Sequence, residues 1–383
     1  MASNQSLSCP SHNNGTLYDN ELSASSSEKP QTTKDMWYED LAPMLLEMLQ
    51  GADYAATVIK SHMVFFREKI CTTLGPHPSI SCVNQVFRSY MNDDHTPIEL
   101  SWAWNTGSVY PKVRYSVEPI GDTNTDVYNS MAPEALIKTL MNDGADIDLT
   151  LYEHFNSALA PTEEYTAMAR YSPDTSTKFI AIEVADSGIL STKAYFMSMH
   201  HGHSSIVNII RAVTAYPHAN DNLLKALNNV FQSLSAHMAD LNLQVPMLAV
   251  DCIDPSKARI KIYIRTPYTD FKSVVMMAEI GGAKLTTAQH SSLRGLWYAV
   301  LSLDGAVGDG AALPPTSHRT GGIIYHFDLQ LSRPAPKVKI YIPVKHYGKN
   351  DGAVARGLSQ WLEEHGMGVK GFSHYVDAVK EMW

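Results

Sequence analysis

The chain has 383 residues, of which 44% are hydrophobic and 18% are charged, with a net charge of −9. These values are typical of a globular protein with a large core, and the negative charge argues against nucleic acid as a partner. Because the N-terminus lacks a secretory signal, no apolar run reaches membrane-spanning length and the four cysteines show no CxxC spacing, we expect a cytoplasmic protein without a membrane span, disulfide framework or zinc site.

The predicted elements begin after a polar tail. Residues 1–35 are rich in Ser, Asn and Thr and are expected to be disordered, whereas residues 36–383 are expected to form a single domain. Apolar residues spaced by about 3.6 predict helices at 36–50 and 54–74. Beyond them, pairs of strands alternate with pairs of helices in the repeating order helix, strand, strand, helix.

Four strand pairs follow from the alternation of polar and apolar residues. They are 98–104 with 112–119, 178–185 with 192–198, 246–253 with 258–264, and 322–330 with 337–344. Helices are predicted at 131–142, 148–159, 204–215, 221–241, 270–280, 288–303 and 353–365, before a short segment at 371–379. Hairpins joined by helix pairs favour an antiparallel sheet with all helices on one face. We therefore predict an α+β fold, an antiparallel β-barrel ringed by helices whose polar strand face lines the lumen.

The stretch KARIKIYIR (257–265) places its charges and its apolar residues on opposite faces of one strand. A lysine followed two residues later by a tyrosine recurs on three strands, as Lys193/Tyr195, Lys261/Tyr263 and Lys339/Tyr341, and Arg114 and Arg259 add guanidinium groups. Solvated strands with lysines at sheet edges explain any single pair. Three repeats favour a shared task.

Cations in a water-poor cavity require an anion, because buried like charges repel and are costly to desolvate. A diphosphate fits this requirement, since arginine forks and lysine ammonium groups share its oxygens. Tyrosine rings beside the cations stabilise a carbocation through their π faces and exclude water. The pattern predicts a site that ionises an allylic diphosphate.

Several stretches in this order resemble the fungal dimethylallyltryptophan synthase family of aromatic prenyltransferases. They are TPIELSWAW, VRYSVEPIG, TKAYFMS, ARIKIYI, GGIIYHFDL and KVKIYIPVKHYG, and the resemblance extends from about residue 36 to the C-terminus. It implies a ten-stranded antiparallel barrel ringed by helices, with the reaction in the lumen. It also implies transfer of a dimethylallyl group from dimethylallyl diphosphate to an electron-rich aromatic carbon, without a metal or other cofactor.

The resemblance assigns roles to individual residues of this sequence. Diphosphate binding is expected of Arg114, Lys193, Arg259, Lys261 and Lys339, and a tyrosine shield over the allylic cation is expected of Tyr195, Tyr263, Tyr341 and Tyr375. Glu99 is the expected catalytic carboxylate, which accepts a hydrogen bond from the indole N–H of the acceptor and orients the ring.

Two departures from the family pattern bear on the acceptor and on the fold. Members that prenylate free tryptophan at the indole 4-position carry a lysine on the strand before TKAYF, whereas this strand has none after Lys178 and carries Glu183. We therefore expect that the acceptor is not free tryptophan attacked at that position, and that Glu99, water or the released diphosphate is the final base. The expected acceptor is an indole in an alkaloid or tryptophan-derived metabolite. The sequence stops at Trp383, before a last strand that is usual in the family.

Three alternatives stay open at this point: prenylation of a phenol, quinone or polyketide, a barrel that binds ligand without catalysis, and a homodimer. Other motifs are read as structural. Asp93 and Asp94 lack the further aspartate of a DDxxD motif, and His200, His201 and His203 have no carboxylate or cysteine near them. On the strand 322–330, either Tyr325 or His326 faces the lumen, and likewise either Ile323 or Ile324.

Overall fold

The computed structural model describes residues 31–79, 88–104, 110–121, 126, 128–161, 176–188, 190–198, 203–235, 243–282, 284–366 and 376. The chain divides into a unit of residues 1–32 and a unit that begins at Thr33, and all elements below belong to the second unit. The predicted tail up to residue 30 and the segment 371–379, apart from Val376, lie outside the described residues.

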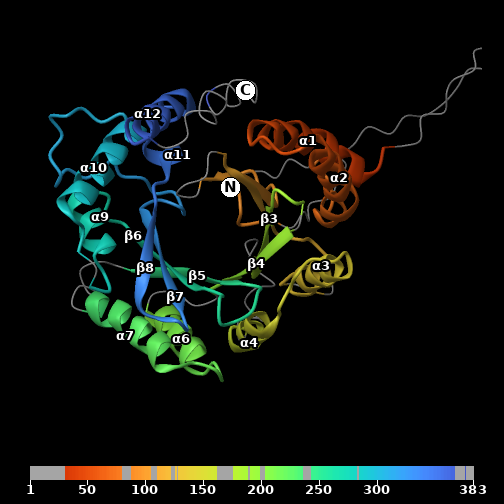
Figure 1. Ribbon diagram of the computed structural model, residues 1–383, viewed down its shortest axis with the longest axis horizontal. Coiled ribbons are helices and arrows are strands. Elements are labelled where there is room, and N and C mark those ends of the chain that lie inside the picture. The colour runs from red at the N-terminus through yellow and green to blue at the C-terminus, as the bar shows by residue number, and fades with distance from the viewer. Residues whose placement is uncertain are drawn as a thin grey trace, which may run out of the picture. The chain divides into compact units, whose positions relative to one another are not determined.

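The second unit is built on one antiparallel sheet whose eight strands neighbour one another in sequence order. The strands are β1 (Ile98–Ala103), β2 (Lys112–Val117), β3 (Lys178–Val184), β4 (Leu190–Met197), β5 (Gln244–Asp251), β6 (Ile260–Thr266), β7 (Ile323–Gln330) and β8 (Arg333–Tyr341). All four predicted hairpins are present, and the sheet curves around a central space (Figure 1). Within the described residues β1 and β8 are its two edges, and no ladder joins them.

The helices lie outside the curved sheet (Figure 1). They are α1 (Thr33–Gly51), α2 (Ala56–Phe65), α3 (Met131–Asn142), α4 (Thr150–Ala158), α6 (His203–Thr214), α7 (Asp221–Ser235), α9 (Phe271–Ala278), α10 (Thr287–Leu301), α11 (Val344–Tyr347) and α12 (Asp351–Glu364). The helix predicted at 54–74 is broken: α2 is followed by a π-helical turn, Phe66–Ile70, and a 3₁₀ turn, Cys71–Thr73. In the π turn, Phe66 and Ile70 are both fully buried. The short helix α11 was not predicted.

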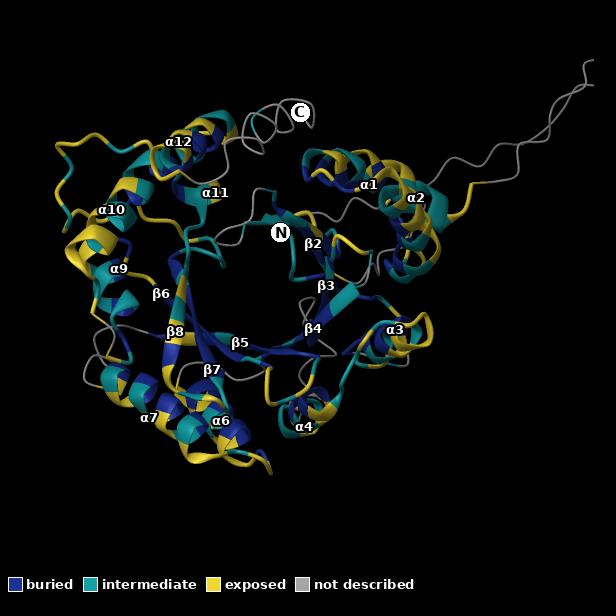
Figure 2. Cartoon of the chain, viewed as in Figure 1, coloured by how far each residue is buried: buried dark blue, intermediate teal, exposed yellow. Residues whose placement is uncertain are grey.

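Helix α7 shows why these segments are helical and where they pack. Its buried residues recur at three- and four-residue spacing: Leu223, Ala226, Leu227, Val230, Phe231 and Leu234. Such a stripe forms one apolar face of an amphipathic helix, and α7 packs with it against β7 and β8. Figure 2 shows the same division around the ring, with buried residues on the sheet and on the helix faces that meet it. No described helix has both the length and the apolar character needed to cross a membrane.

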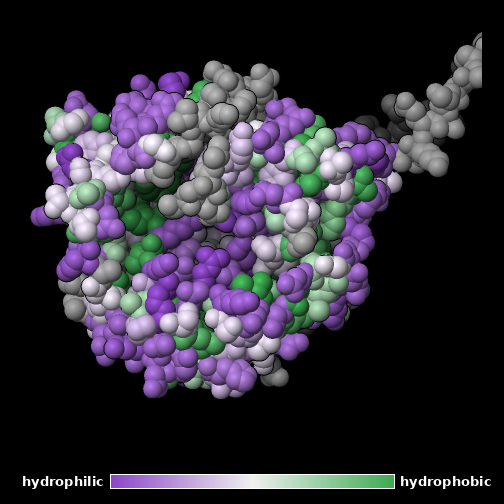
Figure 3. Space-filling model, in the orientation of Figure 1, coloured by the Kyte–Doolittle hydropathy of each residue, from purple (hydrophilic) through white to green (hydrophobic). Residues whose placement is uncertain are grey.

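Strand register sorts the side chains onto two faces of the sheet. On the outer face, Ile262 pairs with Phe327 of β7, and both are fully buried beneath the helices. On the inner face, Lys193 pairs with Asp251 and Lys261 pairs with Asp328. Directly paired residues share a face, so the polar face lines the central space as predicted, and hydrophilic residues gather around the centre of the molecule in Figure 3. The predicted α+β barrel class is confirmed.

Candidate active site

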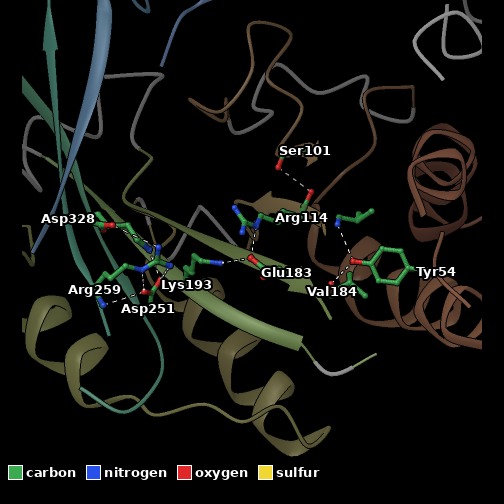
Figure 4. A network of polar contacts seen from close by, with 11 residues as sticks. Tyr54, Ser101, Arg114, Glu183, Val184, Lys193, Asp251, Arg259 and Asp328 are labelled. Atoms are coloured by element: carbon green, nitrogen blue, oxygen red, sulfur yellow. Dashed lines mark hydrogen bonds and ion pairs between the residues drawn. The ribbon is translucent and has the colours of Figure 1, made fainter. Parts of the chain in front are cut away.

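Five cations predicted to bind a diphosphate lie on the inner face of the sheet. We call them the cation cluster: Arg114 of β2, Lys193 of β4, Arg259 just before β6, Lys261 of β6 and Lys339 of β8. They come from every second strand of the curved sheet, and the strands between them continue the same inner-face register. Figure 4 shows Arg114, Lys193 and Arg259 pointing into a common network of polar contacts.

Asp251 holds two members of the cluster together. Its Oδ2 accepts a hydrogen bond from Arg259 Nε at 2.6 Å, and its Oδ1 accepts one from Lys261 Nζ at 2.5 Å. Burial lowers the pKa of Lys261 to about 8, although Asp251 opposes the change. Burial also resists ionisation of Asp251, but Lys261 and Arg259 outweigh it and lower the pKa of this carboxyl to about 2. The site thus contains an ionised aspartate in contact with two cations.

Glu183 of β3 holds two further members of the cluster together, Arg114 of β2 and Lys193 of β4. Its Oε2 is 2.5 Å from Arg114 Nε and 3.2 Å from Lys193 Nζ. Burial opposes ionisation of Glu183, but Lys193 and Arg114 prevail and lower its pKa. The sequence left the orientation of Glu183 undecided. The structure places it inside the barrel, as a carboxylate engaged with two cations.

Lys339 is the fifth cation of the cluster, and neighbouring positive charges repel its ammonium group. Its Nζ lies 5.2 Å from the centre of the Tyr341 ring, which is a cation–π distance. Although the Lys339 side chain is accessible to water, desolvation by the surrounding protein, followed by the charges of Arg114 and Arg259, lowers its pKa. An anion bound between these groups relieves their repulsion, so the cluster is suited to a multiply charged anion.

Three of the four predicted shield tyrosines form one layer of rings beside the cations. The centres of the Tyr195 and Tyr263 rings are 6.0 Å apart, and those of Tyr263 and Tyr341 are 5.8 Å apart. Burial raises the pKa of all three phenols, so each stays protonated and uncharged. Tyr375 lies outside the described residues.

His326 completes this aromatic layer. Its ring centre is 5.2 Å from that of Tyr263, and its Nδ1 lies 3.1 Å from the hydroxyl oxygen of Tyr341. Burial, with the charges of Lys261 and Lys339, lowers its pKa to about 3, so the imidazole is neutral. Tyr325 is fully buried on the outer face, which settles the choice between these two neighbours.

Glu99 lies on the inner face of β1, where it pairs with Ser116 of β2. Its negative charge contributes to the raised pKa values of the Tyr195 and Tyr341 phenols. Although the Glu99 side chain is accessible to water, it stands inside the curved sheet, and the surrounding protein raises its pKa by desolvation. Glu99 is therefore a carboxylate with increased basicity beside the aromatic layer.

The remaining candidates separate into inner and outer positions. Ile324 pairs with Arg265 and with Tyr341 on the inner face, whereas Ile323 is fully buried on the outer face. The Asp93 carboxylate pairs with Lys345 and lies 3.0 Å from His318.

Metal-ligating residues do not gather in the described part of the chain. His203 is the first residue of α6, while His200 and His201 lie outside the described residues. Within the residues that the structure describes, no three His, Cys, Asp or Glu side chains form a group that could hold a metal ion.

Sequence reasoning missed two inner-face carboxylates, Asp251 and Asp328. Asp328 is 8% exposed, lies 4.0 Å from Arg259 Nη1, and pairs in register with Lys261 and Lys337. The signal was in the sequence, since Asp251 lies within the predicted strand 246–253 and Asp328 lies two residues after His326 on the same face. Strand alternation alone identifies both once the inner face is known.

The family profile described as tryptophan dimethylallyltransferase matches residues 33–378, which include the whole curved sheet and its helices. The chain belongs to this family. A 4-O-dimethylallyl-L-tyrosine synthase of Claviceps purpurea is 32% identical over 96% of this chain and 85% of its own length. A 7-dimethylallyltryptophan synthase of Aspergillus fumigatus is 28% identical over 91% of this chain and 78% of its own.

Solved structures agree on the fold. The crystal structure of NotF in complex with brevianamide F and DMSPP superposes with a TM-score of 0.76 at 19% identity, covering 94% of this chain and 88% of that one. The family resemblance and the barrel fold inferred from the sequence are both confirmed. The protein is an enzyme of the dimethylallyltransferase type.

Proposed function

We propose that this prenyltransferase ionises dimethylallyl diphosphate in its lumen and transfers the dimethylallyl group to an aromatic acceptor held by Glu99. The observation that carries the proposal is the placement of five cations beside a layer of three tyrosines and a neutral histidine. When the diphosphate group of the donor binds at the cation cluster, the dimethylallyl carbons lie next to that layer.

The chemistry follows from this arrangement. Breaking the C–O bond leaves both electrons on the diphosphate, and the cation cluster stabilises the developing negative charge. The allylic cation left behind faces the π surfaces of Tyr195, Tyr263 and Tyr341, which stabilise it and exclude water. Because the cluster itself supplies the countercharge, we propose that the transfer proceeds without a metal ion.

Glu99 sets which acceptors suit the site. Among the described inner-face carboxylates, Glu183 and Asp251 have lowered pKa values and are engaged with cations, so they are poor bases. Asp328 has a raised pKa but lies within the cation cluster, 4.0 Å from Arg259 Nη1. Glu99, with its raised pKa, is better suited to accept a proton. When a phenolic oxygen is alkylated, the only proton lost is that of the O–H group, which moves along its hydrogen bond to the Glu99 carboxylate.

A base at Glu99 therefore favours a phenolic oxygen as the nucleophile. A further observation supports the choice, because the 32% identical Claviceps relative is described as a 4-O-dimethylallyl-L-tyrosine synthase. The second candidate is the indole acceptor predicted from the sequence, which the 28% identical 7-dimethylallyltryptophan synthase supports. Attack through an indole carbon requires another acceptor for the ring proton, such as water or the released diphosphate.

The experiment is an incubation of the protein with dimethylallyl diphosphate, EDTA and separate acceptors, L-tyrosine, L-tryptophan and an indole alkaloid precursor, with products identified by mass spectrometry and NMR. We expect a dimethylallyl ether of the phenol. A carbon-prenylated indole as the main product would replace the phenol proposal by the indole one. Tight donor binding without product would indicate a barrel that only binds ligand, and loss of all turnover in EDTA would refute the metal-free mechanism.

A further inference from the structure

Asp328 is an inner-face carboxylate whose charge the protein leaves poorly compensated. Among the residues that the structure describes, its closest cationic nitrogen is Arg259 Nη1 at 4.0 Å, and none donates a hydrogen bond to its buried Oδ1. His326 Nε2 lies 3.8 Å from the same oxygen, but that imidazole is neutral. A buried carboxylate oxygen that accepts no hydrogen bond is costly in its ionised form.

The contrast with Asp251 shows that this is a property of the position. Asp251 is also buried, yet both of its oxygens accept hydrogen bonds from cations at 3.1 Å or less. For Asp328, burial raises the pKa, and the charges of Arg259 and Lys261 offset only part of the increase. Of the two aspartates, only Asp328 has a raised pKa.

The groups that face Asp328 come from three strands besides its own. They are Arg259 and Lys261 from β6, Asp251 from β5, Arg333, Lys337 and Lys339 from β8, and His326 from β7. Within the cation cluster and its three carboxylates, five positive charges face Glu183, Asp251 and Asp328, which leaves a net charge of +2. A bound diphosphate adds further negative charge beside these carboxylates.

We propose that Asp328 takes up a proton from solvent when the donor diphosphate binds, so that donor and proton enter the site together. The inference rests on the proposed binding of a diphosphate at the cation cluster. A diphosphate there draws Arg259 toward its own oxygens and away from Asp328. It also adds negative charge beside the Asp328 carboxylate, whose Oδ1 accepts no hydrogen bond from the described residues. Both changes favour the protonated form of Asp328.

The test is calorimetric titration with dimethylallyl thiolodiphosphate, an unreactive donor analogue, in buffers that differ in ionisation enthalpy. Between about pH 6 and 7, we expect the wild type to take up close to one proton more than Asp328→Asn. Lys261 has a pKa of about 8 and holds its proton in this range. Titration of the analogue itself is common to both proteins and cancels in the difference. The wild-type Kd is expected to increase with rising pH more steeply than that of Asp328→Asn, by up to about tenfold per pH unit.

His326→Gln is the matched control, because it removes the other titratable group beside the same oxygen and is expected to keep the extra proton. Equal proton uptake by wild type and Asp328→Asn, or loss of the extra proton in His326→Gln instead, would overturn the proposal. An infrared difference spectrum requires only the wild type: binding of the analogue should add the C=O stretch of a protonated carboxylic acid, and its absence refutes the assignment. Failure of the analogue to bind at all would contradict the proposed function as well.

Discussion

Removing the carboxylate of Asp251 tests how the cation cluster is held in the absence of donor. In Asp251→Asn, Lys261 loses the partner that its Nζ contacts at 2.5 Å, and Arg259 loses a two-pronged contact. Lys261 is only 3% exposed, so its ammonium group is left in the interior without the carboxylate that it contacts. The variant therefore isolates the cost of gathering these cations.

The size of the effect follows from the burial of the pair. Removing one partner of a buried ion pair typically costs about 3–5 kcal/mol of unfolding free energy. Lys261 already has a pKa lowered to about 8, and without Asp251 it can release its proton near neutral pH and limit the loss. We therefore expect the lower end of this range, about 3 kcal/mol. We also expect Asp251→Asn to lose less unfolding free energy at higher pH, because Lys261 is then neutral in the folded protein and no longer requires a countercharge.

The assay is urea unfolding with and without inorganic pyrophosphate. Pyrophosphate supplies the anion that the substitution removes, so it should stabilise Asp251→Asn more than the wild type. Asp186→Asn is the control, because Asp186 forms an ion pair with Lys112 at 2.6 Å but its side chain is 84% exposed, and such pairs contribute little. The reasoning is refuted if Asp251→Asn loses no more stability than Asp186→Asn, or if pyrophosphate stabilises the variant less than the wild type.

Three further substitutions test separate parts of the account. Glu99→Gln should lower turnover by about 10²- to 10⁴-fold while the Kd of dimethylallyl thiolodiphosphate stays the same; a parallel loss of both would contradict the assigned role. Glu118 is 1% exposed, and burial raises its pKa to about 7. The free energy of unfolding should therefore fall by about 3 kcal/mol in total as the pH rises from about 4.5 to 7. In urea unfolding, Glu118→Gln should abolish that fall. Tyr54 donates a hydrogen bond to the carbonyl of Val184 and accepts one from the N–H of Val113, so Tyr54→Phe should cost about 1–3 kcal/mol, and an unchanged midpoint would refute this contribution.

Much of the architecture was predictable from strand alternation and helical spacing. The helix predicted at 131–142 has the bounds of α3, Met131–Asn142, and the four hairpins are all present. The break after Phe65 was not predictable, because a π turn depends on how Phe66 and Ile70 reach the core and not on their spacing alone. Strand parity also predicted that Tyr195 and Tyr263 share the inner face.

The limits of sequence reasoning lie in the pairing of charges. Parity identified Lys261 as an inner-face residue, but its partner Asp251 lies on a different strand, and only the register of β5 with β6 brings the two together. The same holds for Glu183, which contacts Arg114 and Lys193 across β2 and β4. The positive groups were found because they repeat, whereas the carboxylates that hold them occur once per strand.

A crystal structure of the protein with dimethylallyl thiolodiphosphate is the most direct measurement of where the donor binds. The account predicts diphosphate oxygens within hydrogen-bonding distance of Lys193, Arg259 and Lys261, and dimethylallyl carbons against the rings of Tyr195 and Tyr263. A diphosphate bound outside the curved sheet, with the inner-face cations still paired only to their carboxylates, would contradict it.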